Sequence, residues 1–462
     1  MRNPIPVALI AALMAMPVQA GERDLERLQD EAVERLQAYV RIDTVNPPGN
    51  ESRGVEYLAQ LLAAAGIKYE TAESAPGRGN LWARLEGGPG KALVLLHHID
   101  VVPADPRFWT TDPLGGEIRD GYLYGRGTVD TKSLGIFGLQ AFLELHRAGK
   151  PLSRPVIFVA TADEEAGGEF GAGWLVQNRP EIFADAGLLL NEGGSGIVSG
   201  ARQILSVEAA QKVPLWLRLT VTDRPGHGSA PRPQSSVTRL VRALDIIARN
   251  PFEPRVVPAV DQYAKARAAA GIGSQPERGA DLGAAVRDAD FLKKVRAEDP
   301  AFAALLQDTC AITRLHGSDK INVVPPEAWA EIDCRLLPDQ DPDVFIALLH
   351  KLIGDDGVQI QKLASWGPTS SPLDSPLFAA IEAVGAKHHP GAKVTPAVLN
   401  GFTDSHFFRE RGIAAYGYSP IMMPIEEILR VHGNDERLSI ENIRRGTVMM
   451  LELVERLVYA PE

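Results

Sequence analysis

The chain of 462 residues has only two cysteines, Cys310 and Cys334, which excludes a fold held together by a network of disulfides. Neither lies in a CxxC pair or beside a histidine, so a thiolate zinc site has little support. Whether the two cysteines pair stays open at this stage. After the N-terminus, no run approaches the roughly 18 apolar residues of a membrane-spanning helix. Positive charge is not in excess either: the net charge of -11 argues against non-specific nucleic-acid binding.

The N-terminal 20 residues have the pattern of a secretory signal peptide. Arg2 precedes an apolar run from Val7 to Met16, and Val18-Gln19-Ala20 forms a small-residue cleavage site. We therefore expect cleavage after Ala20 and a secreted or periplasmic protein. A disordered apolar start is the alternative interpretation.

Short, nearly continuous apolar runs alternate with helical patterns in the first part of the chain. Such runs are typical of parallel strands covered by helices on both faces. The sequence predicts an α/β fold with a parallel or mixed sheet. The expected strands are Ala92–His97, Val156–Ala162 and Ala186–Asn191, and the expected helices are Asp24–Val40, Gly54–Ala65 and Ile136–Arg147.

The pattern changes near residue 213. Pro214–Val221 alternates apolar and polar residues, as a half-exposed antiparallel strand does. Further helical and strand-like segments follow, which predicts an inserted α+β domain that acts as a lid or dimerisation surface. The expected division is a catalytic domain over 21–212, an inserted domain over 213–366 and the rest of the catalytic domain over 367–462.

Acidic and histidine residues follow the predicted strands directly. Because the carboxyl ends of the strands of an open α/β sheet form its binding edge, these residues are expected to share a site. Each alone has an ordinary explanation as a loop histidine or a solvated acidic turn. Together they offer complementary metal-ligand types, which favours a two-metal hydrolase. The set is His98, Asp130, Glu164, Glu165, Glu192 and His432.

The motifs around these residues resemble those of the co-catalytic zinc exopeptidases and aminoacylases, which include carboxypeptidase G, carboxypeptidase S, aminoacylase and succinyl-diaminopimelate desuccinylase. The resemblance covers nearly the whole chain after the N-terminal segment and looks closest to the carboxypeptidase S-like branch. Its carriers are His98-Ile99-Asp100, Gly125-Arg126-Gly127 with Asp130, Asp163-Glu164-Glu165, Asn191-Glu192-Gly193-Gly194, Gly226-His227-Gly228 and Val431-His432-Gly433.

The resemblance implies two zinc ions that share Asp130, with cobalt or manganese as possible substitutes. One ion would also bind His98 and Glu192, and the other would bind Glu165 and His432. The resemblance further implies roles for residues that are not ligands. Glu164 would be the general base, Asp100 would orient His98, and His227 would stabilise the oxyanion, often from a partner subunit.

The same resemblance places Asn322, Arg335 and Gly401 in contact with the substrate. An arginine fork suits a terminal carboxylate, although an ion pair at a strand edge is the ordinary role for Arg335. Relatives often have Gly-Thr-Asp followed by Ser-Arg near Gly401. Here Phe402 intrudes and His406 replaces the arginine, so the substrate contacts are expected to differ.

The sequence therefore predicts an exported dizinc metallohydrolase that cleaves peptides with a free carboxylate. An N-acyl-amino-acid amidohydrolase is the alternative, and a non-catalytic binding protein on the same fold is a remote one. The inserted domain is also expected to be a possible homodimer contact.

Overall fold

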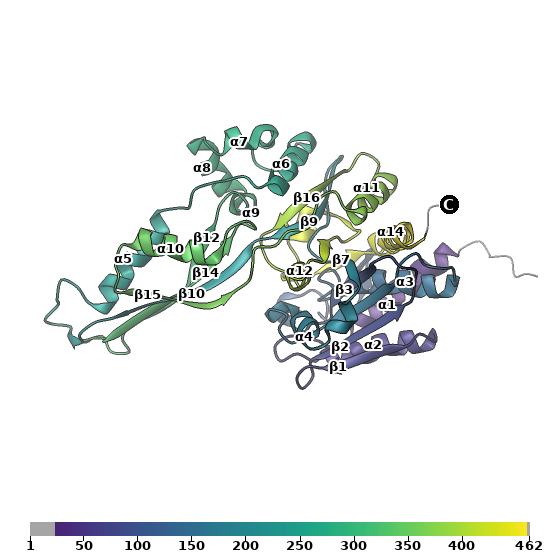
Figure 1. The fold of residues 1–462 in the computed structure, drawn as a ribbon, viewed down its shortest axis with the longest axis horizontal. Coiled ribbons are helices and arrows are strands. Elements are labelled where there is room, and N and C mark those ends of the chain that lie inside the picture. The colour runs from purple at the N-terminus through teal and green to yellow at the C-terminus, as the bar shows by residue number, and fades with distance from the viewer. Residues whose placement is uncertain (1–23, 460–462) are drawn as a thin grey trace, which may run out of the picture.

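The computed structural model describes residues 24–459, so the predicted signal peptide lies outside the described residues. Two lobes stand side by side in Figure 1: one is built on a large sheet near both ends of the chain, and the other projects from it. Among residues 24–459, no helix combines the length and apolar character that crossing a bilayer demands.

The large sheet has ten strands, and its order along the main path is β1-β2-β6-β3-β7-β17-β9-β8-β18, with β16 also paired to β9. The pairs β6–β3, β3–β7 and β7–β17 are parallel, whereas β1 and β2 run antiparallel at one edge. The predicted α/β fold with a mixed sheet is thus confirmed. The strands are β1 (Tyr69–Glu73), β2 (Gly79–Leu85), β3 (Ala92–His98), β6 (Val156–Thr161), β7 (Ala186–Asn191), β8 (Gly196–Ser199), β9 (Arg202–Gln211), β16 (Lys393–Leu399), β17 (Ala414–Gly417) and β18 (Met422–Pro424).

Strand β3 shows why the central strands are apolar throughout. Its residues alternate between two cores: Leu93 and Leu95 lie in one, and Val94 and Leu96 lie in the other. Successive side chains point to opposite faces, so both faces must be covered. Helices on one face are α1 (Leu25–Val40), α2 (Glu51–Ala64), α3 (Lys132–Ala148), α11 (Pro376–His388) and α14 (Ile440–Val458), and those on the other are α4 (Ala172–Asn178) and α12 (Ser405–Arg409).

A small sheet, in the order β19-β5-β4, joins two distant parts of the chain at the site. Strand β5 (Tyr122–Tyr124) precedes the loop that carries Asp130, and β19 (Arg437–Ser439) follows His432. The two strands pair antiparallel, with Arg437 opposite Tyr124. Their pairing brings the two loops together. Strand β4 (Ile118–Arg119) completes this sheet, and the short helix α13 (Ile425–Ile428) lies between β18 and His432.

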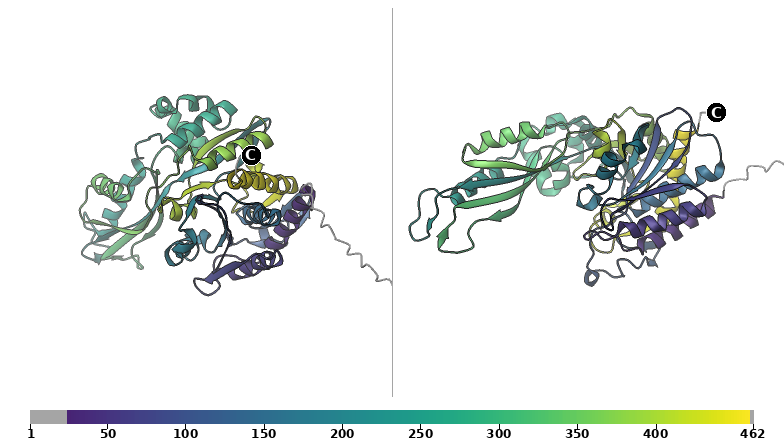
Figure 2. Two further views of the ribbon diagram at one scale, coloured as in Figure 1. Left: turned by 45° about the vertical axis from the view of Figure 1, so that its right-hand side comes forward. Right: turned by 60° about the horizontal axis from the view of Figure 1, so that its bottom comes forward.

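The projecting lobe is a four-stranded antiparallel sheet in the order β12-β14-β10-β15. Along β10, Leu215, Leu217 and Leu219 are buried, while Trp216 is exposed, which confirms the expected alternation. Both views of Figure 2 show how far this lobe extends from the large sheet. Its elements are β10 (Val213–Thr222), β12 (Thr309–His316), β14 (Glu327–Leu336), β15 (Val358–Ser365), α5 (Ser236–Arg249), α10 (Pro342–Ile353) and the short antiparallel pair β11 (Gly226–His227) and β13 (Val323–Val324).

Helix α6 (Pro258–Ala270), which lies between α5 and β12, packs on strands β9 and β16 of the large sheet, and the three short helices that follow it share its core. Val260 and Ala264 share a core with Ala210 of β9 and Val398 of β16. This part of the predicted inserted domain is therefore attached to the large sheet at β9 and β16. The helices are α6 (Pro258–Ala270), α7 (Leu282–Ala285), α8 (Ala289–Glu298) and α9 (Pro300–Ala304).

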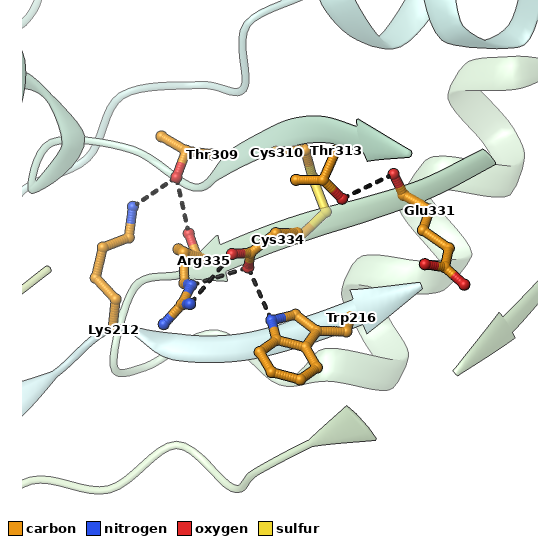
Figure 3. Close-up of a disulfide and its surroundings, with 9 residues drawn as sticks. Lys212, Trp216, Thr309, Cys310, Thr313, Glu331, Cys334 and Arg335 are labelled. Atoms are coloured by element: carbon orange, nitrogen blue, oxygen red, sulfur yellow. Dashed lines mark hydrogen bonds and ion pairs between the residues drawn. A yellow bond between two sulfur atoms is a disulfide. The ribbon is translucent and has the colours of Figure 1, made fainter. Parts of the chain in front are cut away.

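Cys310 of β12 and Cys334 of β14 form a disulfide, a pairing that the sequence left open. They are register partners on adjacent antiparallel strands, with their Cα atoms 4.0 Å apart. Figure 3 shows Arg335 next to this cross-link, with Lys212 bonded to Thr309 at the start of β12. The disulfide thus attaches the edge strand to the strand that carries Arg335.

Candidate metal centre

His98 is fixed at the end of β3. The residue is 1% exposed, and its Nδ1 lies 2.9 Å from the backbone carbonyl oxygen of Asp100. Because a carbonyl oxygen can only accept a hydrogen bond, Nδ1 is the donor. In the neutral imidazole this leaves the lone pair on Nε2, which is the arrangement of a metal-binding histidine.

The carboxylate of Asp100 supports a different part of the site. Its oxygens accept hydrogen bonds from the backbone nitrogens of Glu164 and Glu165, both at 3.1 Å. The nearest carboxylate oxygen is 3.5 Å from His98 Nδ1. The expected contact of Asp100 with His98 is therefore made by the backbone carbonyl, while the side chain orients the turn that carries both glutamates.

Asp130 lies between the two histidines. One carboxylate oxygen is 3.1 Å from His98 Nε2, and the other is 3.0 Å from His432 Nε2. His432 Nε2 is also 3.1 Å from a carboxylate oxygen of Glu165. The two halves of the site thus share Asp130.

Glu192 and Glu164 complete the cluster from the ends of β7 and β6. Carboxylate oxygens of Glu192 and Glu164 lie 3.6 and 4.0 Å from His98 Nε2. Ligand atoms of His98, Glu164 and Glu192 lie within 4.8 Å of one another, as do those of His98, Asp130 and Glu165. The structure therefore brings together all six residues of the predicted metal cluster.

The electrostatics of this cluster favour bound cations. Burial raises the pKa of Glu192 to about 7, and burial together with repulsion from Glu192 raises the pKa of Glu164 well above its ordinary value. Hydrogen bonds with Asp130 and Glu165 raise the pKa of His432 to about 10. Although burial opposes it, the neighbouring carboxylates also raise the pKa of His98. The raised pKa values show that the negative charge of these crowded carboxylates is unfavourable without a counter-charge. Bound cations would supply that charge in place of protons.

The donor set fits two divalent ions. Each half offers an imidazole nitrogen and carboxylate oxygens, which suit zinc and several related ions. In addition, Oε1 of Glu165 is buried without a hydrogen-bond partner among residues 24–459. A buried acceptor of this kind is costly unless it has a ligand.

Glu436 supports the site but was missed in the sequence. Its carboxylate pairs with Arg126 at 2.6 Å and accepts hydrogen bonds from the backbone nitrogens of Gly127, Val129 and Asp130. It is fully buried. Its position four residues after His432 is the one feature of the sequence that relates it to the cluster.

Asn46 is a second supporting residue that the sequence did not indicate. Its amide donates hydrogen bonds to Asp100 at 2.9 Å and to Asp163 at 3.3 Å. Asp163 has a φ of 70°, at the turn before Glu164. Asn46 therefore connects the loop between α1 and α2 to the turn that carries Glu164 and Glu165.

A cavity of about 430 Å³ opens beside the cluster. Arg335 and Gly401 line it, as the resemblance implied for substrate contacts. Arg335 pairs with Asp333 at 2.9 Å and lies 5.7 Å from the ring centre of Phe402. Most of the remaining wall away from the acidic cluster is apolar: Val129, Leu399, Phe402, Ile421, Met423, Ile428 and Val431.

His227 and Asn322 are not among the residues that line this cavity. Both are exposed on the projecting lobe, His227 in β11 and Asn322 directly before β13, where the Gly228 nitrogen donates a hydrogen bond to the Asn322 carbonyl at 2.8 Å. The arrangement of the two lobes in this structure therefore leaves the predicted oxyanion histidine outside the cavity.

Comparison with known proteins agrees with this geometry. The family model described as Peptidase family M20/M25/M40 matches residues 94–456. The N-fatty-acyl-amino acid synthase/hydrolase PM20D1 of Xenopus tropicalis is 29% identical, over 93% of this chain and 86% of that protein. Aminoacylase-1 of Sus scrofa is 28% identical, over 93% of this chain and 96% of that protein.

A solved structure shows the same fold. The M20 family metallo-carboxypeptidase Sso-CP2 of Sulfolobus solfataricus aligns with a TM-score of 0.69 at 20% identity, over 93% of this chain and 99% of that one. The expected family is thus confirmed on both sequence and fold. The chain belongs to peptidase family M20/M25/M40, whose metallopeptidases and aminoacylases hydrolyse amide bonds.

Proposed function

We propose that this protein is an exported dizinc hydrolase of N-acyl amino acids and short peptides with a free carboxylate, and that substrates with apolar groups are preferred. The observation that carries the proposal is the cavity in which Arg335, an apolar wall and the acidic cluster meet. The similarity to the PM20D1 protein and to aminoacylase-1 supports an acyl amino acid.

Two ions held by His98, Asp130, Glu165, Glu192 and His432 would polarise the amide carbonyl and lower the pKa of water to about 7. The chain's own residues then have distinct tasks. Glu164 accepts a proton from the attacking water and donates it to the leaving nitrogen. The hydrogen bond from its backbone nitrogen to Asp100 holds it for both steps.

Arg335 supplies the specificity for a free carboxylate. Arg335 lines the cavity, and its planar guanidinium fork can bind a carboxylate through two parallel hydrogen bonds. Burial of an apolar side chain contributes about 1.5–3 kcal/mol, so the apolar wall favours apolar acyl groups. His227 would reach the reacting carbonyl only after the lobes close, or from the projecting lobe of a second copy in a homodimer.

A carboxypeptidase or dipeptidase activity is the second candidate, favoured by the 29% identity to the probable carboxypeptidase S-like 2 of Dictyostelium discoideum, over 77% of this chain and 69% of that protein. The free carboxylate is common to both substrate classes, so Arg335 serves either. The two activities differ in the acyl part of the cleaved amide, which is a fatty or other simple acyl group in an N-acyl amino acid and an amino acid in a peptide.

Export is supported by the N-terminal pattern and by the disulfide between Cys310 and Cys334, because disulfides persist in oxidising compartments. Mass analysis of the protein recovered from its native host tests this part. A mature chain that begins at Gly21 is expected, and an intact Met1 in the cytoplasm would contradict it.

The test of activity is hydrolysis of N-acyl amino acids and matched dipeptides by metal-loaded protein, with Glu164→Gln beside the wild type. We expect the variant to keep two metals per chain, measured by elemental analysis, and to lose at least ~10²-fold in kcat. Equal rates in variant and wild type would reject Glu164 as the base. Full metal loading without cleavage of either class would reject the proposed substrates.

A further inference from the structure

A second cavity of about 310 Å³ lies next to the catalytic one. The two share strand β18: Met423 lines both, whereas Met422 lines only the second. The side chain of Asn442, which also lines the second cavity, bonds the backbone nitrogen and oxygen of Met422, both at 2.9 Å. A ligand here would therefore rest on the strand that forms part of the catalytic wall.

Charges of both signs line this second cavity in equal number. Arg437 pairs with Glu427 at 2.8 Å, and Arg445 pairs with Glu441 one helical turn earlier in α14. An anion alone would meet two carboxylates, and a cation alone would meet two guanidinium groups. A ligand with one charge of each sign meets a partner for both.

Two polar atoms that need partners belong to residues lining the same cavity. Among residues 24–459, Nε2 of His389 and Oε1 of Gln203 are buried without a hydrogen-bond partner. His389 is 4% exposed, and its burial, with nearby Arg445, lowers its pKa, so the ring is neutral at pH 7. Such unpartnered atoms cost free energy until a ligand or water satisfies them.

We propose that the second cavity binds a free α-amino acid. The ligand's carboxylate pairs with Arg445, which is partly exposed and uses one terminal nitrogen for Glu441. The ligand's ammonium group pairs with the carboxylates of Glu427 and Glu441 and donates a hydrogen bond to Gln203 Oε1. The volume suits a ligand of this size and leaves room for water.

A free amino acid is also what hydrolysis of an N-acyl amino acid releases, so the site would sense product; this link alone rests on the proposed function. Since Met423 contributes to both cavities, occupancy of the second is expected to alter kcat for the first. Binding itself is independent of hydrolysis, and the two can fail separately.

The test is calorimetric titration of the metal-loaded Glu164→Gln protein with L-leucine. We expect two binding sites. Arg445→Gln, added to this background, should weaken one of them at least ten-fold and leave the other unchanged. Arg249→Gln is the matched control, because Arg249 forms the same kind of helical pair, with Asp245, in α5 of the projecting lobe and away from the cavity; it should change neither site.

Two analogues test the ligand class. Neither N-acetyl-L-leucine nor 3-methylbutan-1-amine, each of which lacks one charge, should occupy the Arg445-dependent site. Gln203→Leu provides a second variant that leaves all four charges in place, and it should weaken the same site. A single leucine site that persists in both variants would overturn the proposal, as would Arg445-dependent binding of either analogue.

Discussion

Glu436 holds Asp130 by its backbone: the glutamate carboxylate accepts a hydrogen bond from the Asp130 nitrogen at 3.2 Å, across 306 positions of the chain. The same oxygen accepts from Val129 at 2.8 Å, and the other oxygen pairs with Arg126. One side chain thus fixes the loop of the shared aspartate against the segment of His432.

Replacement of Glu436 should therefore loosen the metal centre. Glu436→Gln removes the charge opposite Arg126 and weakens the contacts to the loop, and residues that support ligands typically contribute 10–100-fold in metal affinity. We expect a loss of about that size, measured by competition with a chromogenic chelator. Glu144→Gln, which removes another paired carboxylate remote from the loop, is the control. Equal metal affinity in the two variants would show that Glu436 only stabilises the fold.

The apolar wall of the catalytic cavity predicts a dependence on acyl length. Phe402→Ala removes a large ring that lines the cavity and lies near Arg335. We expect kcat/KM for substrates with long apolar acyl groups to fall by about ten-fold or more, since burial of such a side chain is worth roughly 1.5–3 kcal/mol.

The measurement is a comparison of N-acetyl and long-chain N-acyl forms of one amino acid. Phe108→Ala, at a residue that is 63% exposed and away from the cavity lining, should leave both rates unchanged. A uniform loss for short and long acyl groups in Phe402→Ala would contradict an acyl-binding role.

The disulfide predicts a stability difference in the projecting lobe. A disulfide between residues 24 positions apart restricts the unfolded chain. In the chain-entropy account this raises the free energy of unfolding by about 3 kcal/mol. Replacing both Cys310 and Cys334 with alanine should lower the free energy of unfolding of this lobe by about that amount, measured by urea titration of tryptophan fluorescence. If reduction of the wild type and the double substitution both leave the transition unmoved, the disulfide does not stabilise the lobe.

His406 predicts a loss of stability in acid. Burial lowers its pKa to about 4 from an ordinary 6.5. Between these values the unfolded chain binds a proton here that the folded chain does not, so this contribution to the free energy of unfolding decreases as the pH falls. His406→Phe, which suits the surrounding rings of Trp366 and Phe402, lacks this dependence.

We therefore expect the stability of the wild type relative to His406→Phe to fall by up to about 1.4 kcal/mol per pH unit between pH 6.5 and 4. Urea unfolding of both proteins at pH 7.5, 6 and 5 measures the difference. A difference that stays constant with pH would mean that the folded protein protonates His406 normally.

The central strands could be predicted from the sequence because both of their faces are buried, so that nearly all their residues are apolar, as in β3. Helix starts were less accurate. Helix α2 begins at Glu51, three residues before the predicted start, because this buried glutamate pairs with Arg78 of a distant loop. Helix α3 begins at Lys132, whose buried ammonium donates to the carbonyls of Tyr39 and Ile42. The spacing of apolar residues indicates neither the ion pair of Glu51 nor the hydrogen bonds of Lys132.

The six clustered residues could be predicted because their chemical types are unusual at strand ends. Asn46 and Glu436 could not, because they act through hydrogen bonds to residues that are distant in sequence. The positions of His227 and Asn322 depend on how the two lobes are oriented, which no local pattern specifies.

Arg335 belongs to the projecting sheet, whereas every residue of the acidic cluster belongs to the lobe of the large sheet or its loops. The distance between Arg335, which would bind the carboxylate, and the residues that would act on the amide therefore depends on how the two lobes are oriented. A rotation of one lobe would change that distance, together with the contact between Arg335 and the ring of Phe402. Substrates that differ in the distance between carboxylate and amide would then bind with different orientations of the two lobes.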